Sequence, residues 1–140
     1  MFATSVNLIR NLKYMGIYVA VVTSSKNCEA VLLATGILNL FDARVDGNVA
    51  MERGLAGKPA PDTYEEAARM LEVPPELIVI VEDAVSGVLA AKTEGFGLII
   101  GVARAADPVP TSWSTTSWIS PWFGDRIRAS RRILMEGEMR

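Results

Sequence analysis

The sequence predicts an α/β fold built on a doubly wound parallel sheet. Two continuous apolar runs, at 17–22 and 77–81, are rich in β-branched residues, and such runs are typical of strands buried on both faces of a parallel sheet. Segments with apolar residues at helical spacing lie between the predicted strands, and several of them end at a glycine, as helices often do. This alternation predicts crossover helices that cover both sides of the sheet.

The predicted elements occupy the first 104 residues. A first helix lies between a cap at Thr4 or Ser5 and a stop at Gly16. Residues 46–61 are rich in glycine and proline and are expected to form a loop. The other predicted elements are, in chain order, a strand at 17–22, a helix at 28–35, a short strand at 43–45, a helix at 63–71, a strand at 77–82, a helix that ends at Gly95 and a strand at 97–102.

Composition excludes several classes of function. Half of the 140 residues are hydrophobic, which is enough for one domain with a substantial core. The net charge of −2 gives no basic footprint for nucleic acid, so we expect no nucleic-acid partner. The sequence contains no histidine, which excludes a histidine-dependent triad, a histidine-ligated zinc site and histidine general-base chemistry within this chain.

Cysteine content and the length of the apolar runs indicate the cellular setting. The single cysteine, Cys28, excludes an internal disulfide and a multi-cysteine metal site. No apolar run approaches the ~20 residues that a membrane-spanning helix needs, and the polar and apolar residues mixed over 1–15 do not resemble a signal peptide. We therefore expect a cytoplasmic protein with no membrane partner.

Two acidic residues end the most apolar predicted strand. Glu82 and Asp83 follow the 77–81 run directly and precede a predicted helix. Ligands of open α/β sheets bind just outside the carboxyl ends of the strands, and carboxylates beside a helix N-terminus suit a hard cation or phosphate chemistry. The alternative is that Asp83 simply caps the helix.

Two further polar segments have the same two interpretations. Thr23 begins a cluster of hydroxyls, a cation and an amide after the 17–22 strand, which suits hydrogen bonding to phosphoryl oxygens or an ordinary helix cap. Lys58 lies in the segment Gly-Lys-Pro-Ala-Pro-Asp, where the prolines stiffen the chain around it. Its ammonium would act as a point charge on a phosphate. The alternative is a solvated lysine ahead of a helix capped by Asp62.

The last part of the sequence has a different composition. Residues 105–140 hold all three tryptophans and a serine- and threonine-rich stretch at 111–118 without a helical or strand period. Five arginines between 126 and 140 would give a helix at 125–135 a cationic face. We expect a core domain at 1–104, followed by an irregular segment and a basic C-terminal helix or solvated tail at 105–140.

These residues together resemble the haloacid dehalogenase (HAD) superfamily, in its β-phosphoglucomutase-like branch, over about residues 5–104. Thr23 resembles the hydroxyl of the second motif, with Ser24 and Asn27 behind it as further phosphate-binding residues. Lys58 resembles the lysine of the third motif, and the stretch Val-Glu-Asp-Ala-Val-Ser-Gly-Val-Leu-Ala-Ala resembles the fourth motif. Its carboxylates correspond to Glu82 and Asp83.

The resemblance implies a Rossmann-like fold and magnesium-dependent phosphoryl transfer on a small phosphorylated metabolite, such as a sugar phosphate. Thr23 and Lys58 would then be catalytic and phosphate-binding. Asp83 and Glu82 would hold Mg²⁺. The complete enzyme would act through an aspartyl-phosphate.

One motif of the resembling family has no counterpart in the sequence. The family nucleophile lies in an Asp-x-Asp motif on a first strand near the N-terminus, but this chain has no Asp-x-Asp and its first aspartate is Asp42. We therefore expect an incomplete sheet without that central first strand, which would lie between the strands at 17–22 and 77–82, and without the cap domain. The chain is expected to be inactive alone. The alternatives are a non-catalytic phosphate- or metal-binding module and a truncated gene model of a full-length phosphatase.

Overall fold

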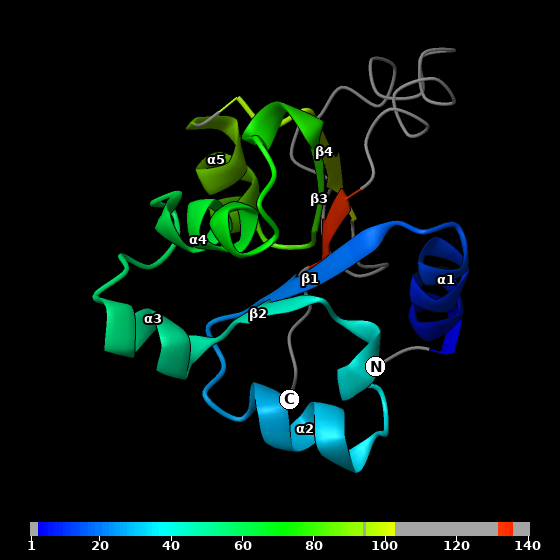
Figure 1. The fold of residues 1–140 in the computed structure, drawn as a ribbon. Helices are drawn as coiled ribbons and strands as arrows, with labels where there is room; N and C mark the ends of the chain where they lie inside the picture. Colours follow the sequence, from blue (N-terminus) through cyan, green and yellow to red (C-terminus); the bar gives the residue numbers. More distant parts are fainter. Residues whose placement is uncertain (1–2, 94, 103–131, 136–140) are drawn as a thin grey trace.

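The computed structural model describes residues 3–93, 95–102 and 132–135. The described strands form one parallel sheet in the order β2-β1-β5-β3-β4 (Figure 1). The strands are β1 (Tyr18–Val22), β2 (Ala43–Val45), β3 (Ile78–Glu82), β4 (Leu98–Gly101) and β5 (Arg132–Met135). The predicted fold class, α/β with a doubly wound parallel sheet, is therefore confirmed.

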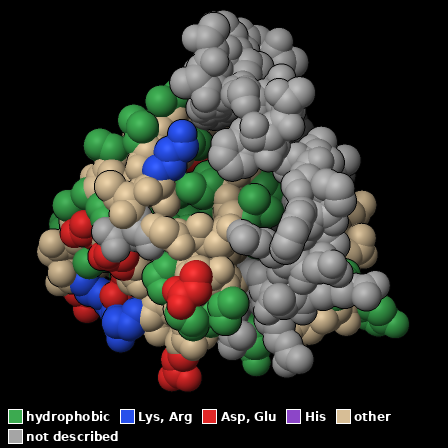
Figure 2. Space-filling model, turned by 90° about the horizontal axis from the view of Figure 1, so that it is seen from above, with side chains coloured by type: hydrophobic (Ala, Val, Ile, Leu, Met, Phe, Trp, Pro, Cys, Tyr) green, Lys and Arg blue, Asp and Glu red, His purple; other side chains and the backbone are tan. Residues whose placement is uncertain are grey.

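Helices connect the strands and lie on both sides of the sheet (Figure 1). They are α1 (Ala3–Tyr14), α2 (Cys28–Ala34), the short 3-10 helix η1 (Leu38–Leu40), α3 (Gly47–Arg53), α4 (Asp62–Met70), the 3-10 helix η2 (Pro75–Leu77) and α5 (Val85–Thr93). Within the described ranges, no helix combines the length and the apolar character needed to cross a membrane. In Figure 2, acidic and basic side chains of the described residues adjoin at the lower left of the view.

The side chains of each strand alternate between two apolar layers, as the period of a strand requires. Ala20 of β1 and Ile80 of β3 belong to the cluster that packs under α4 and α5. Val19 and Val79, their neighbours in sequence, pack with residues of α1 on the opposite face. The sheet is therefore buried on both faces, which explains why β1 and β3 are continuously apolar.

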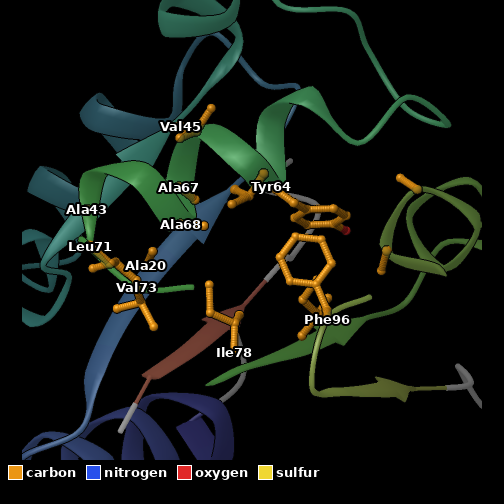
Figure 3. Packing of buried hydrophobic residues seen from close by; sticks show 14 residues of the cluster. Ala20, Ala43, Val45, Tyr64, Ala67, Ala68, Leu71, Val73, Ile78 and Phe96 are labelled. Carbon is orange, nitrogen blue, oxygen red and sulfur yellow. The ribbon is translucent and has the colours of Figure 1, made fainter. Parts of the chain in front are cut away.

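The layer under α4 and α5 contains Tyr64, the largest fully buried side chain among the described residues. Its ring meets Phe96 edge-on, with the ring centroids 6.0 Å apart and the planes at 74° (Figure 3). Ala67 and Ala68 on the same helix are also buried, and their small side chains allow α4 to lie close to the sheet. Tyr64 is thus anchored in the core.

The 46–61 region differs from the predicted loop, because it contains helix α3. The side chain of Asp46 accepts hydrogen bonds from the backbone amides of Asn48 and Val49, which caps the helix start. Gly54, with φ of 66°, ends the helix in the left-handed conformation. The glycines that predicted a loop therefore mark the ends of a short helix.

The alternative interpretation of the Lys58 segment, in which Asp62 caps the next helix, is wrong. Asp62 is the first residue of α4, and Pro61 occupies the cap position without a side-chain hydrogen bond. The Asp62 carboxylate instead accepts a hydrogen bond from the backbone amide of Ala56, 2.9 Å away. It therefore closes the loop that carries Lys58.

The C-terminal segment supplies the central strand of the sheet. We expected a basic helix or a solvated tail in this segment, but Arg132–Met135 is strand β5, which pairs with both β1 and β3. Ile133 lies opposite Val19 on one side and Val79 on the other. Two unpaired strand edges offer rows of free amides and carbonyls, and a short apolar segment satisfies both. The Trp-rich stretch at 111–118 lies outside the described residues.

The central position of β5 can be tested with Leu134→Pro. Proline removes an amide hydrogen from a strand that is paired on both sides. The unpaired acceptor alone should lower the free energy of unfolding by about 1–3 kcal/mol, measured by urea denaturation against Leu134→Ala, which keeps the amide hydrogen. Equal stability of the two variants would show that β5 is not part of the folded sheet.

Candidate active site

Three sequence-predicted site residues lie at the carboxyl edge of the sheet. Thr23 follows β1, and Glu82 and Asp83 lie at the end of β3. Val21 and Val81 are both opposite Met135 of β5, so these two strands end level with each other. With β5 between them, at ~4.8 Å per strand, the residues that follow β1 and β3 are roughly 10 Å apart.

Glu82 is a carboxylate placed in the apolar layer. It continues the alternation of Ile78 and Ile80, so its side chain points to the face covered by α4 and α5. Its exposed fraction is 0%. A buried charge is costly unless it is paired and hydrogen-bonded, so the surroundings of Glu82 have to supply donors.

Four donors surround the Glu82 carboxylate. Its Oε1 accepts hydrogen bonds from the backbone amides of Asp83 and Ala84, at 2.9 and 2.7 Å. Its Oε2 accepts from the ammonium of Lys58 at 3.0 Å and from the hydroxyl of Tyr64. Glu82 therefore ties together the Lys58 loop, helix α4 and the turn before α5.

Helix α5 can pack onto this carboxylate because of one glycine. A Cβ atom added to Gly87 would lie 2.0 Å from Oε2 of Glu82, a distance at which atoms overlap. Gly87 therefore allows the first turn of α5 to cover the carboxylate and to keep water away from it.

Lys58 does not match the solvated-lysine alternative. Its side chain is only 12% exposed, and its Nζ lies 4.9 Å from the centroid of the Tyr64 ring, within cation–π range. Burial lowers the pKa of Lys58, while the negative charges of Glu82 and Asp83 oppose that shift. The ammonium is thus held by a counter-ion and a ring at the sheet edge.

Tyr64 is kept protonated by the same environment. Burial raises the pKa of its hydroxyl, and the adjacent Glu82 carboxylate raises it further. The Tyr64 hydroxyl therefore remains a hydrogen-bond donor throughout the ordinary pH range.

The Thr23 loop is fixed by its own backbone and by α3. Oγ1 of Thr23 accepts a hydrogen bond from the Ser25 amide at 3.2 Å, and the Thr23 side chain is buried. The Asn48 side chain donates to the carbonyl of Lys26 at 2.8 Å. A Cβ atom on Gly47 would lie 2.4 Å from the Ser24 carbonyl oxygen, so α3 approaches the loop closely.

Ser24 and Asn27 are exposed on this loop. Asn27 occupies the cap position of α2 but makes no capping hydrogen bond with its side chain. A plain helix cap therefore does not account for Asn27. Phosphate binding by Ser24 and Asn27 stays a prediction.

The two carboxylates predicted to bind a metal, Asp83 and Glu82, differ in how well they fit one. Among the described residues, no group of three or more histidine, cysteine, aspartate or glutamate side chains is arranged to hold a metal ion. Asp83 is a partly exposed hard oxygen donor, of the kind Mg²⁺ prefers. Both oxygens of Glu82 already accept two hydrogen bonds each. The donor set therefore fits Mg²⁺ through Asp83 better than through Glu82.

Sequence reasoning missed Tyr64 and Gly87. Tyr64 lies in an amphipathic helix, where an aromatic residue is usually part of the core. One signal was present in the alternation of Ile78, Ile80 and Glu82, which places a carboxylate on the buried face and so calls for partners nearby.

Comparisons with known proteins identify the family of the chain. A model of the haloacid dehalogenase-like hydrolases matches residues 1–95. A β-phosphoglucomutase from Mycobacterium bovis is 44% identical over 89 residues, which are 64% of this chain and 34% of that protein.

Two solved structures extend the likeness to the fold. A Thermotoga maritima protein provisionally assigned as a β-phosphoglucomutase is 25% identical, with a TM-score of 0.66 over 93% of this chain and 53% of that one. CbbY from Rhodobacter sphaeroides, solved in complex with phosphate, is 34% identical, with a TM-score of 0.60 over 75% of this chain and 48% of that one.

The chain spans about a third to a half of the length of these relatives, consistent with an incomplete version of their fold. The family model covers well over half of the chain, and the similar proteins have the same parallel-sheet architecture. The chain belongs to the haloacid dehalogenase-like hydrolase family, in its β-phosphoglucomutase-like branch.

Proposed function

We propose that this chain is the phosphate- and metal-binding part of an enzyme that transfers the phosphoryl group of a small phosphorylated metabolite, a sugar phosphate, with Mg²⁺. The observation that carries the proposal is the buried Lys58–Glu82 pair beside Asp83, at the same sheet edge as Thr23. The likeness to a β-phosphoglucomutase and to a CbbY protein solved with phosphate supports the substrate class.

The proposed chemistry needs an aspartate nucleophile in the complete enzyme. Its carboxylate would attack phosphorus and release the sugar hydroxyl, and the aspartyl-phosphate would then give the phosphoryl group to water or to a second hydroxyl. The Lys58 ammonium and the Thr23 hydroxyl would stabilise charge on the phosphoryl oxygens. Mg²⁺, when bound at Asp83, would neutralise part of the same charge.

A non-catalytic module that binds phosphate or metal is the second candidate. The observation in its favour is strand β5, which fills the centre of the sheet from within the chain. A truncated gene model of a full-length phosphatase accounts equally for the missing Asp-x-Asp. The DNA upstream of the first codon distinguishes a truncated gene model from a non-catalytic module, because only the former predicts an in-frame Asp-x-Asp there.

The first test is turnover. Because the 140 residues contain no Asp-x-Asp, we expect no hydrolysis of p-nitrophenyl phosphate or of sugar phosphates with Mg²⁺ above the level of the Asp83→Ala variant. A phosphatase activity that stays with the purified wild-type chain and disappears in Asp83→Ala would contradict this prediction.

The second test is ligand binding by calorimetry. Loss of a carboxylate ligand in Asp83→Ala should weaken Mg²⁺ binding at least about tenfold, about 1.4 kcal/mol, whereas Glu52→Ala, which removes an exposed carboxylate of α3, should not. Lys58→Met and Thr23→Val should weaken the binding of inorganic phosphate. Equal Mg²⁺ affinity in wild type and Asp83→Ala would show that Asp83 holds no metal in this chain.

A further inference from the structure

We infer that Tyr64 is a positioning residue, which acts on Lys58 through the shared carboxylate of Glu82 and through its own ring. This inference rests on the proposed function, because Lys58 is the lysine that would contact the phosphoryl group. It assigns a functional task to a side chain that otherwise belongs to the hydrophobic core.

The position of the Tyr64 hydroxyl is determined by packing. The side chain is completely buried, and its ring is held edge-on against Phe96 (Figure 3). A close-packed aromatic ring has few alternative rotamers. The hydroxyl at its tip therefore reaches Oε2 of Glu82 from a fixed direction.

The same carboxylate oxygen holds the lysine. Oε2 of Glu82 accepts from Tyr64 and from Lys58, whose Nζ lies 3.0 Å away. Oε1 of Glu82 accepts hydrogen bonds from the backbone amides of Asp83 and Ala84. The carboxylate therefore cannot rotate without breaking several hydrogen bonds. Tyr64 is therefore a second side-chain anchor of Oε2, beside the lysine.

The ring of Tyr64 adds a direct contact. The Lys58 ammonium lies 4.9 Å from the ring centroid, so the hydroxyl and the π-face of one residue act on the same cation. The long lysine side chain would otherwise have many rotamers. The two contacts with Tyr64 and Glu82 therefore restrict where the ammonium can lie.

The chain contains a surface counterpart, which likewise consists of a lysine, a carboxylate and a tyrosine. Lys13 pairs with Asp42 at 2.5 Å and lies 5.6 Å from the ring centroid of Tyr18. Tyr18 is 44% exposed, whereas Tyr64 is 0% exposed. Contacts between exposed groups are weak because water competes for them, so the surface trio serves as a matched control.

The test measures the acylation rate of each lysine by mass spectrometry at a fixed pH near neutral, together with phosphate affinity. Tyr64→Phe keeps the ring and removes the hydroxyl. We expect Lys58 to react at least about threefold faster than in wild type and inorganic phosphate to bind at least about threefold more weakly. Exposed Lys26 should react at an unchanged rate, and Tyr18→Phe should leave Lys58 unaffected.

An unchanged Lys58 rate in a folded Tyr64→Phe variant overturns the inference, even if phosphate binding weakens. If Tyr64→Phe does not fold, Phe96→Leu replaces it, because it removes the edge contact that holds the Tyr64 ring and leaves Glu82 and Lys58 in place. Lys58 should again react faster, and an unchanged rate again overturns the inference. If wild type binds no phosphate, the proposed function fails, while the labelling rates still decide the role of Tyr64.

Discussion

The burial of one negative charge, on Glu82, determines how the other parts of the candidate site are arranged. A carboxylate in an apolar layer is tolerated only when its oxygens are paired. The turn before α5 supplies two amides, α4 supplies the Tyr64 hydroxyl, and the 46–61 region supplies the Lys58 ammonium. Gly87 then allows α5 to close over the group. The demand for donors thus brings three distant segments together.

The core and the site depend on the same strand geometry. Side chains of β3 alternate between the two faces, so the period that buries Ile78 and Ile80 under α4 and α5 also turns Glu82 into that layer. Removing one partner of a buried ion pair leaves the other charge buried without compensation, which lowers the free energy of unfolding by about 3–5 kcal/mol. The Lys58–Glu82 pair therefore links the stability of the α4–α5 layer to the charge presented at the sheet edge.

The sequence predicts the parts that depend on local pattern. The apolar runs predicted β1 and β3, and chain order predicted that Thr23 and Asp83 lie at one edge, because parallel strands end together. Strand β5 could not be predicted in this way, since its conformation depends on two edges formed by residues far earlier in the chain. Lys58 and Glu82 were interpreted separately, as a phosphate ligand and a metal ligand. To predict that they pair, one would have to know toward which face of the sheet each side chain points.

The central strand separates the two candidate functions. Thr23 and Asp83 follow the strands on either side of β5. The segment that fills the central position therefore also supplies the residues that lie between the Thr23 hydroxyl and the Asp83 carboxylate. A strand that ends in an aspartate would place a nucleophile there, next to the cation of Lys58. A strand that ends otherwise would leave the proposed phosphate-binding groups, Thr23 and Lys58, without a nucleophile beside them. The two proposed functions therefore differ in the identity of one strand, while the hydrogen bonds of Glu82 that hold Lys58 are the same in both.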